Sequence, residues 1–235
     1  MPRLFIGTSG YSYKEWKGSF YPEKLSPKKM LSFYGERFDS VEINNTFYRL
    51  PRREVLETWA SQVPASFRFA VKASRRITHQ HRINEGAASP LQYLLDNLSV
   101  LGDKLGTVLF QLPPYLKKDL GRLQGFLELL PDDLCAAFEF RNVSWYDDEV
   151  FSALSSSNAA LVLADTGNED KDPPFVRTAD WGYLRLRRTS YGDEGLATWA
   201  ARLADPAWTR AFVYFKHEDE GTGPELANRL KELTR

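Results

Sequence analysis

Two glutamates in β-type runs could exchange protons with a substrate. Glu42 stands in the run 40–44 and Glu139 in the run 137–141. Carboxylates in different environments can hold different pKa values, so one can act as an acid while the other acts as a base. The same two side chains could instead only neutralise cations such as Lys72 or Arg185. Both interpretations are open, and acid–base work is the one we pursue.

Basic residues lie at or near the ends of similar runs. Lys72 and Lys216 could act as electrophiles or imine-forming nucleophiles if they were desolvated. Beside carboxylates they would stay protonated and bind an anion, which is the role we favour. The guanidinium groups of Arg141, Arg185 and Arg187 match the geometry of phosphate or carboxylate. We therefore expect a small anionic substrate whose negative charge these cations stabilise.

Several other polar or aromatic side chains could orient such a substrate. They follow or end β-type runs, or lie in the turn that begins at Gly7 and could let backbone amides approach a ligand. This set consists of Thr8, Tyr11, Asn44, Tyr48, Gln111, Trp145 and Asp165.

The sequence does not favour a metal or an organic cofactor. It has three histidines and one cysteine, Cys135, and the cations near the carboxylates would repel a metal ion. An oxygen-ligated site from Glu42, Glu139 and Asp165 is the alternative. No Walker, dinucleotide-binding or nucleophile-elbow motif is present, so we expect no cofactor.

The elements that must position these residues alternate along the chain. Strands are predicted at 3–8, 39–44, 67–72, 106–111, 136–140, 160–164, 182–187 and 211–216. Helices are predicted at 26–37, 52–61, 90–101, 119–129, 147–157, 194–204 and 224–233, and the sixth strand is followed by loop. Alternation favours a parallel sheet, and eight strands favour closure into a barrel. We predict one α/β, TIM-type domain over 1–235 with a long, aromatic first loop at 8–25.

The two-residue period of a strand predicts which of these side chains face the barrel interior. Val41 and Ile43 suit the helix side, which turns Glu42 and Asn44 inward. The same alternation turns Lys72 inward. By the same reasoning, six more side chains are predicted to face the interior: Glu139, Arg141, Tyr183, Arg185, Arg187 and Lys216. Sites of barrel enzymes lie at the carboxyl ends of the strands, so we expect a charged pocket there.

Composition narrows the class of protein. The chain has 31 basic and 31 acidic residues, whereas a dedicated nucleic-acid binder is usually basic. No apolar run approaches the ~18 residues that a membrane helix needs. The first residues enter a strand without signal-peptide architecture, so we expect a cytoplasmic protein.

Short stretches spread from residue 6 to residue 217 carry a family resemblance. They are 6–13, 20–22, 41–48, 69–72 with 77–79, 110–114, 139–141 with 144–145, and 213–217. In this order they resemble the bacterial and archaeal family catalogued as domain of unknown function 72. The resemblance implies a TIM-type barrel and supplies no reaction. Fold-level analogy to sugar isomerases and zinc-dependent apurinic endonucleases adds a nucleic-acid hypothesis, which fold alone does not establish.

Three functional hypotheses remain open. The leading one is an enzyme that acts on a small anionic substrate, with proton transfer by Glu42 and Glu139. The second is a nucleic-acid binding or processing protein, in which the arginines at 75, 76, 82 and 185–188 track phosphates beside exposed aromatics. The third is a non-catalytic binding or scaffold barrel with a closed, paired charge layer. The oligomeric state is not predicted.

Overall fold

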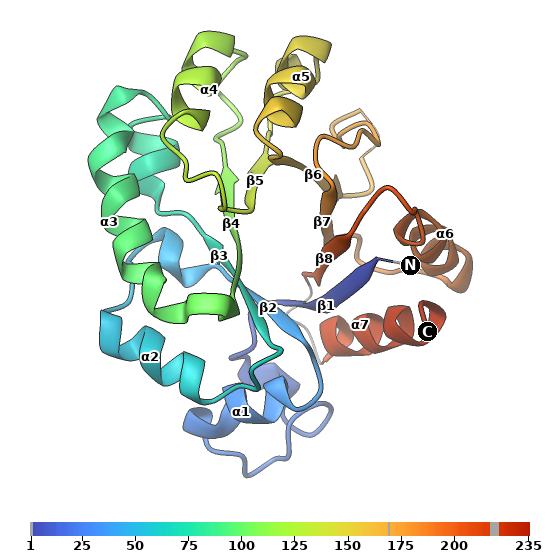
Figure 1. Cartoon of the computed structure of the whole chain (residues 1–235). Coiled ribbons are helices and arrows are strands. Elements are labelled where there is room, and N and C mark those ends of the chain that lie inside the picture. The colour runs from blue at the N-terminus through green and yellow to red at the C-terminus, as the bar shows by residue number, and fades with distance from the viewer. Residues whose placement is uncertain (1, 169, 217–220) are drawn as a thin grey trace.

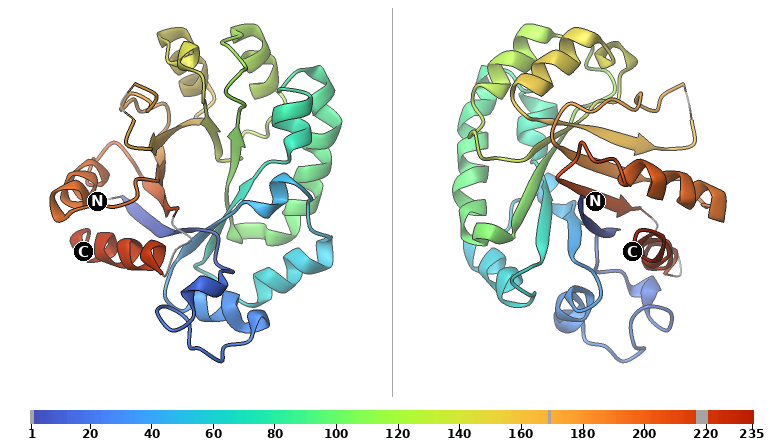
Figure 2. Two further views of the ribbon diagram at one scale, coloured as in Figure 1. Left: turned by 180° about the vertical axis from the view of Figure 1, so that it is seen from behind. Right: turned by 45° about the vertical axis from the view of Figure 1, so that its right-hand side comes forward.

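A closed barrel of eight parallel strands forms the centre of the computed structural model, which describes residues 2–168, 170–216 and 221–235 (Figures 1 and 2). The strands follow one another in chain order around the ring, and helices surround it. They are β1 Arg3–Ser9, β2 Ser40–Ile43, β3 Arg68–Lys72, β4 Leu105–Gln111, β5 Ala136–Glu139, β6 Ala160–Asp165, β7 Trp181–Leu186 and β8 Arg210–Phe215. The predicted TIM-type fold is confirmed.

The helices fall where the sequence pattern predicts them. They are α1 Met30–Gly35, α2 Arg53–Ser61, α3 Ala88–Leu98, α4 Leu120–Leu127, α5 Asp148–Ser156, α6 Asp193–Leu203 and α7 Thr222–Leu233. Between β6 and β7 the described residues form no helix, as the loop composition of that stretch predicts. Within the described ranges, no helix combines the length and apolarity needed to cross a bilayer.

The strands separate two hydrophobic cores. Between the strands and the helices lies a large core rich in leucine and phenylalanine. Inside the barrel lies a smaller core that mixes aromatic and small side chains. There Phe5 stacks on Phe212 with ring centroids 4.9 Å apart, and Ala70 and Ala137 leave room for the large rings. The interior is therefore packed rather than hollow along its length.

The long first loop is ordered by its aromatic residues. Trp16 is fully buried, and its ring lies 5.8 Å from that of Phe20 and 6.1 Å from that of Tyr21. Phe20 in turn meets Phe33 of α1 at 5.7 Å. These rings pack the loop against α1.

A side chain completes the contact between β1 and β2. The hydroxyl of Tyr34 accepts a hydrogen bond from the Thr8 amide at 2.8 Å and donates to the Ser40 carbonyl at 3.0 Å. Gly7 makes this possible, because a Cβ atom there would lie 2.0 Å from the Ser40 carbonyl oxygen and 2.7 Å from the Tyr34 hydroxyl. The phenol thus bridges the carboxyl end of β1 and the first residue of β2.

Candidate functional site

A buried arginine joins two glutamates at the carboxyl ends of the strands. Arg185 of β7 donates from Nη2 to Glu42 of β2 at 2.9 Å and from Nη1 to Glu139 of β5 at 2.5 Å. All three side chains are at most 3% exposed. We call these three residues the inner layer. Because two carboxylates share one guanidinium, this layer carries a net negative charge.

Glu42 is held ionised by hydrogen bonds from β1, from β7 and from Asn44, which follows β2. Ser9 of β1 donates its hydroxyl to Glu42 Oε1, Asn44 donates its amide at 2.9 Å, and Tyr183 donates to Oε2 at 2.7 Å. Burial opposes ionisation, but Arg185 and these hydrogen bonds outweigh it and lower the pKa of Glu42.

Glu139 has a second set of donors. The amide of Gln111 donates to Oε2 at 2.8 Å, Arg141 Nε lies 3.3 Å from Oε1, and Arg187 Nη1 lies 3.8 Å from Oε1. Burial again opposes ionisation, but Arg185, Arg141 and the Gln111 hydrogen bond lower the pKa of Glu139 to about 2. This carboxylate therefore stays ionised at neutral pH.

Lys72 lies above this layer without a carboxylate partner. Its Nζ donates to Gln111 Oε1 at 2.8 Å and lies 4.4 Å from the centre of the Phe47 ring. It forms no ion pair within 4.0 Å among the described residues. Burial and the nearby Arg185 lower the pKa of its ammonium group to about 8. At neutral pH Lys72 is mostly protonated and gives up its proton unusually readily.

A histidine completes the surroundings of Lys72. The ring of His79 lies 4.9 Å from that of Phe47, and its Nδ1 lies 2.9 Å from the Thr78 hydroxyl. Burial, with the charges of Lys72 and Arg141, lowers the pKa of His79. The lowered pKa favours the neutral form of the imidazole.

Positive charge dominates the solvent side of the cluster. We call Lys72, Arg141 and Arg187 the outer layer; the Arg141 and Arg187 side chains are 36% and 21% exposed. Together the two layers hold four cations against two carboxylates. Arg185 also has a buried Nε–H that finds no hydrogen-bond partner in the described part of the chain. The arrangement suits a small anion approaching from the strand ends.

Asp165 and Thr8 lie outside this cluster, on the helix side of the barrel. Asp165 ion-pairs with Arg188 at 2.5 Å and accepts a hydrogen bond from the indole of Trp199 in α6 at 3.0 Å. The Thr8 hydroxyl lies 2.9 Å from that of Tyr34 in α1. Neither side chain reaches the two glutamates. Among the described residues, no group of three or more His, Cys, Asp or Glu side chains could hold a metal ion.

The remaining predicted site residues differ in burial. Trp145 is fully buried, stacks on Phe140 at 4.7 Å and donates its indole N–H to the Leu116 carbonyl at 2.8 Å, so it packs rather than faces the cluster. Tyr11 is half-buried against Tyr34. Tyr48 is 74% exposed beside Phe47, and Lys216 is exposed just after β8.

The prediction omitted four residues that the structure brings to the cluster. Ser9 shares the inward side of β1 with Phe5, a period-two signal that could have identified it. Tyr183 has the inward phase of β7 and is predicted to face the interior, but not to bind Glu42. His79 and Phe47 lie in short turns, where no periodicity exists to place them.

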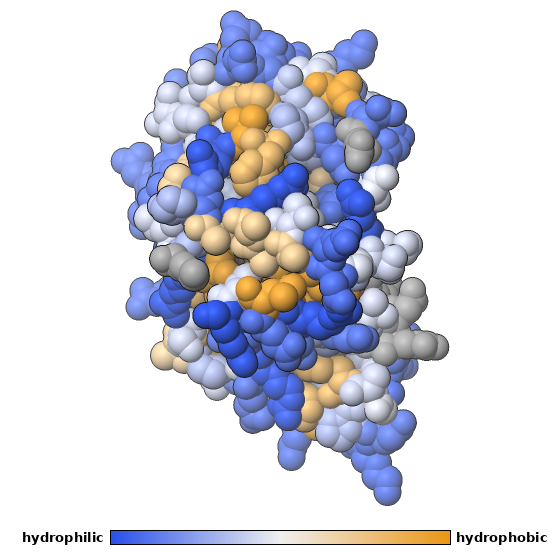
Figure 3. Space-filling model, turned by 90° about the vertical axis from the view of Figure 1, so that its right-hand side faces the viewer, coloured by the Kyte–Doolittle hydropathy of each residue, from blue (hydrophilic) through white to orange (hydrophobic). Residues whose placement is uncertain are grey.

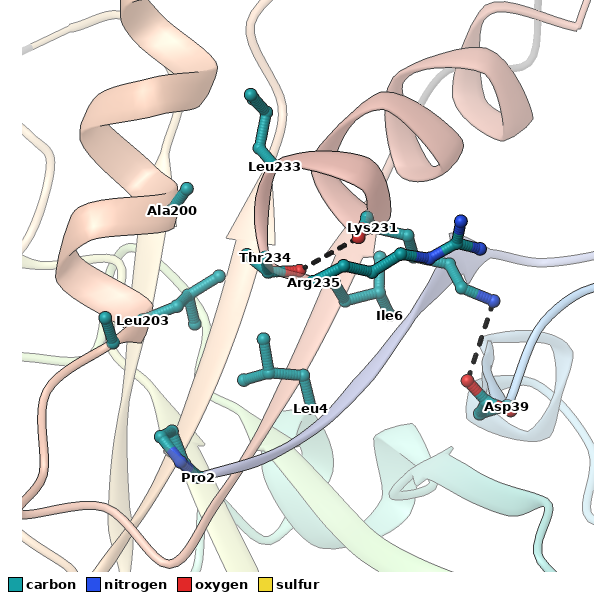
Figure 4. Close-up of a pocket in the computed structure, with 11 residues that line it drawn as sticks. Pro2, Leu4, Ile6, Asp39, Ala200, Leu203, Lys231, Leu233, Thr234 and Arg235 are labelled. Carbon is teal, nitrogen blue, oxygen red and sulfur yellow. Dashed lines mark hydrogen bonds and ion pairs between the residues drawn. The ribbon is translucent and has the colours of Figure 1, made fainter.

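An apolar hollow lies elsewhere, near the two chain ends. The face in Figure 3 carries apolar surface framed by hydrophilic side chains. Leu4 of β1, Leu203 of α6 and Leu233 of α7 line a hollow of about 270 Å³ (Figure 4). The ion pair between Lys231 and Asp39, at 3.6 Å, borders it. The charged groups at this hollow are Asp39, Lys231 and Arg235, and Lys231 and Asp39 pair with each other.

Comparisons with known proteins agree with this architecture. The model of a family described as "Protein of unknown function DUF72" matches residues 5–235. UPF0759 protein YunF of Bacillus subtilis is 31% identical over 152 residues, which cover 61% of this chain and 52% of YunF. YecE of Escherichia coli K12 is 28% identical over 144 residues, 61% of this chain and 50% of YecE. The chain thus spans about half the length of the curated relatives it matches.

A solved structure extends the likeness to the whole barrel. A DUF72 family protein from Thermotoga maritima superimposes with a TM-score of 0.84 over 98% of both chains, at 23% identity. At that identity the likeness establishes a shared fold and carries no activity with it.

Proposed function

The chain belongs to the DUF72 family, whose description gives no activity, and from that premise we propose that it is an enzyme that binds a small anionic substrate at the carboxyl ends of its strands. Lys72, Arg141 and Arg187 would hold the anion. Lys72 would also transfer a proton to or from it, with the neutral imidazole of His79 as the complementary base.

The excess of cations in the outer layer is the observation that carries this proposal. A structural ion-pair plug needs each buried charge to find its opposite, because an unpaired charge away from water is costly. Here the two carboxylates are already saturated by arginines and hydrogen bonds, yet among the described residues Lys72 meets only an amide oxygen and a ring face. An anionic ligand would supply the missing partner.

Proton transfer is assigned to Lys72 rather than to the glutamates. A general acid or base works best when its pKa lies near the working pH. Glu139, with a pKa of about 2, is too weak a base at pH 7, whereas Lys72, with a pKa of about 8, is well matched. In this proposal Glu42 and Glu139 position Arg185 and set the charge of the site.

Sulfate is a suitable first probe, because it stays a dianion at neutral and alkaline pH, where the proton of Lys72 dissociates. Calorimetric titration should detect sulfate binding to the native protein that weakens as pH rises through about 8, where Lys72 loses its proton. Lys72→Met should weaken binding by about tenfold below that pH, the equivalent of ~1.4 kcal/mol, and should remove the pH dependence.

A matched control separates the site from general charge effects. Lys28→Met removes an equally charged but exposed lysine before α1 and should leave both affinity and pH dependence unchanged. Citrate, tested in the same way, asks whether a carboxylate ligand is preferred. If native protein and Lys72→Met bind sulfate and citrate equally at every pH, the proposed site is refuted.

Exposed aromatics near His79 favour nucleic acid as a second candidate. Tyr48 and Tyr115 are 74% and 65% exposed, and the Tyr115 hydroxyl donates to the His79 carbonyl at 3.4 Å. Arg75 and Arg76, which precede His79 by four and three residues, are also exposed. Such a surface could stack bases and contact phosphates. Titrating fluorescent single-stranded RNA and DNA at low and high salt tests it, and absence of binding at low salt excludes it.

A further inference from the structure

Three arginines line one hollow at the opposite end of the barrel, where the strands begin. Arg3 is the first residue of β1, Arg68 of β3 and Arg210 of β8. Each stands two positions before a residue of the interior core, and side chains two apart share one face of a strand. Arg3 and Arg210 are also direct partners across the β1–β8 ladder.

These arginines lack ion-pair partners. Among the described residues none of the three has a carboxylate oxygen within 4.0 Å, although Asp103 and Asp133 line the same hollow. Burial and the charge of Arg3, followed by that of Arg210, lower the pKa of Arg68 despite the opposing effect of Asp103. Like charges are therefore gathered here rather than dispersed.

The hollow beneath them is large enough for a small molecule. Its volume is about 510 Å³, within the ~300–1,000 Å³ of small-molecule sites. The stacked Phe5 and Phe212 form its floor, and the guanidinium carbons of Arg3 and Arg68 lie 4.8 and 5.9 Å from the centre of the Phe5 ring. Apolar side chains complete the wall: Leu95, Leu105 and Leu134.

A glycine keeps the floor close to the arginines. A Cβ atom on Gly106 of β4 would lie 2.8 Å from the Phe212 ring and 3.0 Å from Cβ of Arg68. The first distance is shorter than real Cβ contacts and the second is unusually tight, so a larger residue here would displace the Phe212 ring. The aromatic floor and the Arg68 stem can therefore meet at the base of the hollow.

We propose that this hollow binds a small organic phosphate whose apolar body lies on the Phe5–Phe212 floor while its phosphate reaches the guanidinium groups of Arg3, Arg68 and Arg210. Guanidinium forks match phosphate oxygens, and no carboxylate of residues 2–168, 170–216 or 221–235 forms an ion pair with these three cations. An inorganic anion alone would leave the aromatic floor uncovered. This site is independent of the cluster at the carboxyl ends of the strands.

The single cysteine gives the site its own reporter. Cys135 lines the hollow, its Sγ accepts a hydrogen bond from Arg210 Nη2 at 3.2 Å, and the sequence contains no other thiol. A ligand in the hollow should shield this sulfur from an alkylating reagent. The rate of Cys135 modification therefore reports occupancy here and not at the opposite end of the barrel.

Phenyl phosphate is the probe, compared with inorganic phosphate and with phenol. Phenyl phosphate at millimolar concentration should slow iodoacetamide modification of Cys135, and the other two should protect at concentrations about tenfold higher or not at all. Arg68→Met and Arg3→Met should each weaken this protection by about tenfold, with folding checked by thermal unfolding. Arg53→Met, an exposed arginine of α2, is the matched control.

Lys72→Met distinguishes this proposal from the proposed function. Protection that persists in Lys72→Met and is lost in Arg68→Met and Arg3→Met supports the second site whatever happens to sulfate binding at the other end. An unchanged alkylation rate with phenyl phosphate, or protection that only Lys72→Met removes, overturns it.

Discussion

The inner and outer layers of the cluster use similar side chains under opposite conditions. In the inner layer Arg185, Glu42 and Glu139 are buried and paired with each other. In the outer layer Lys72, Arg141 and Arg187 reach toward solvent, and cations exceed the carboxylates they can share. Buried charges of the inner layer are satisfied by one another and stabilise the fold, whereas the incompletely paired charges of the outer layer can still bind a ligand.

Arg185→Met should have the largest effect on stability, because it removes the cation of the inner layer. It would strand two carboxylates in a buried layer, and removing one partner of a buried ion pair costs about 3–5 kcal/mol. We expect the free energy of unfolding, measured by denaturant titration, to fall by that amount.

The complementary variant identifies the source of that loss. Arg185→Met combined with Glu42→Gln and Glu139→Gln removes the stranded charges and should recover most of the stability. Arg53→Met, on the exposed face of α2, should change stability by less than ~0.5 kcal/mol. Equal stability of Arg185→Met and native protein would mean that the inner layer is not a structural unit.

Glu139→Gln should produce the next largest effect, and a pH-dependent one. A carboxyl whose pKa falls from 4.5 to about 2 on folding stabilises the native state above pH ~4.5, by ~1.4 kcal/mol per pKa unit or ~3 kcal/mol in all. This stability is lost as pH falls through about 2. Denaturant titrations from pH 7 to pH 2 should therefore show the deficit of Glu139→Gln shrinking below pH 5.

Glu57→Gln provides the control for that experiment. Glu57 is exposed and pairs with Arg53 at 3.5 Å, so its replacement should give a small difference at every pH. A deficit of Glu139→Gln that stayed constant from pH 7 to pH 2 would contradict the lowered pKa.

Lys72→Met should have the smallest effect on stability and the opposite sign. Folding lowers the pKa of Lys72 from 10.5 to about 8, so the protonated side chain destabilises the native state at neutral pH. Its removal should raise the free energy of unfolding by ~1 kcal/mol at pH 7, less than the full shift because the group is partly solvated. Between pH 8 and pH 10.5 the native protein should gain stability relative to the variant, and a difference independent of pH would contradict this.

Strand positions were predictable because apolar flanks fix the phase of a strand. In β2, Val41 and Ile43 face the large outer core, which leaves Glu42 no direction but inward. The same alternation places Lys72, Glu139 and Arg185 correctly within the barrel. Each predicted strand agrees with the structure to within one or two residues at either end.

Other parts of the cluster depend on partners distant in sequence. Asp165 ends β6 in the phase of Leu161 and Leu163, so it turns to the helices, where Trp199 and Arg188 meet it. A position at the end of a strand does not by itself direct a side chain to the barrel axis. His79 lies near Lys72 only because a π-helical turn at Arg76–Gln80 follows β3, and nothing in the local pattern indicates that turn.

The bridge made by Tyr34 has a consequence for how the barrel opens. The β1–β2 ladder has three paired positions, whereas the β1–β8 and β7–β8 ladders have six each. Where β1 and β2 meet, the Thr8 amide donates its hydrogen bond to the hydroxyl of Tyr34 in α1. In hydrogen–deuterium exchange the Thr8 amide should therefore lose its protection when α1 detaches, before the barrel unfolds as a whole.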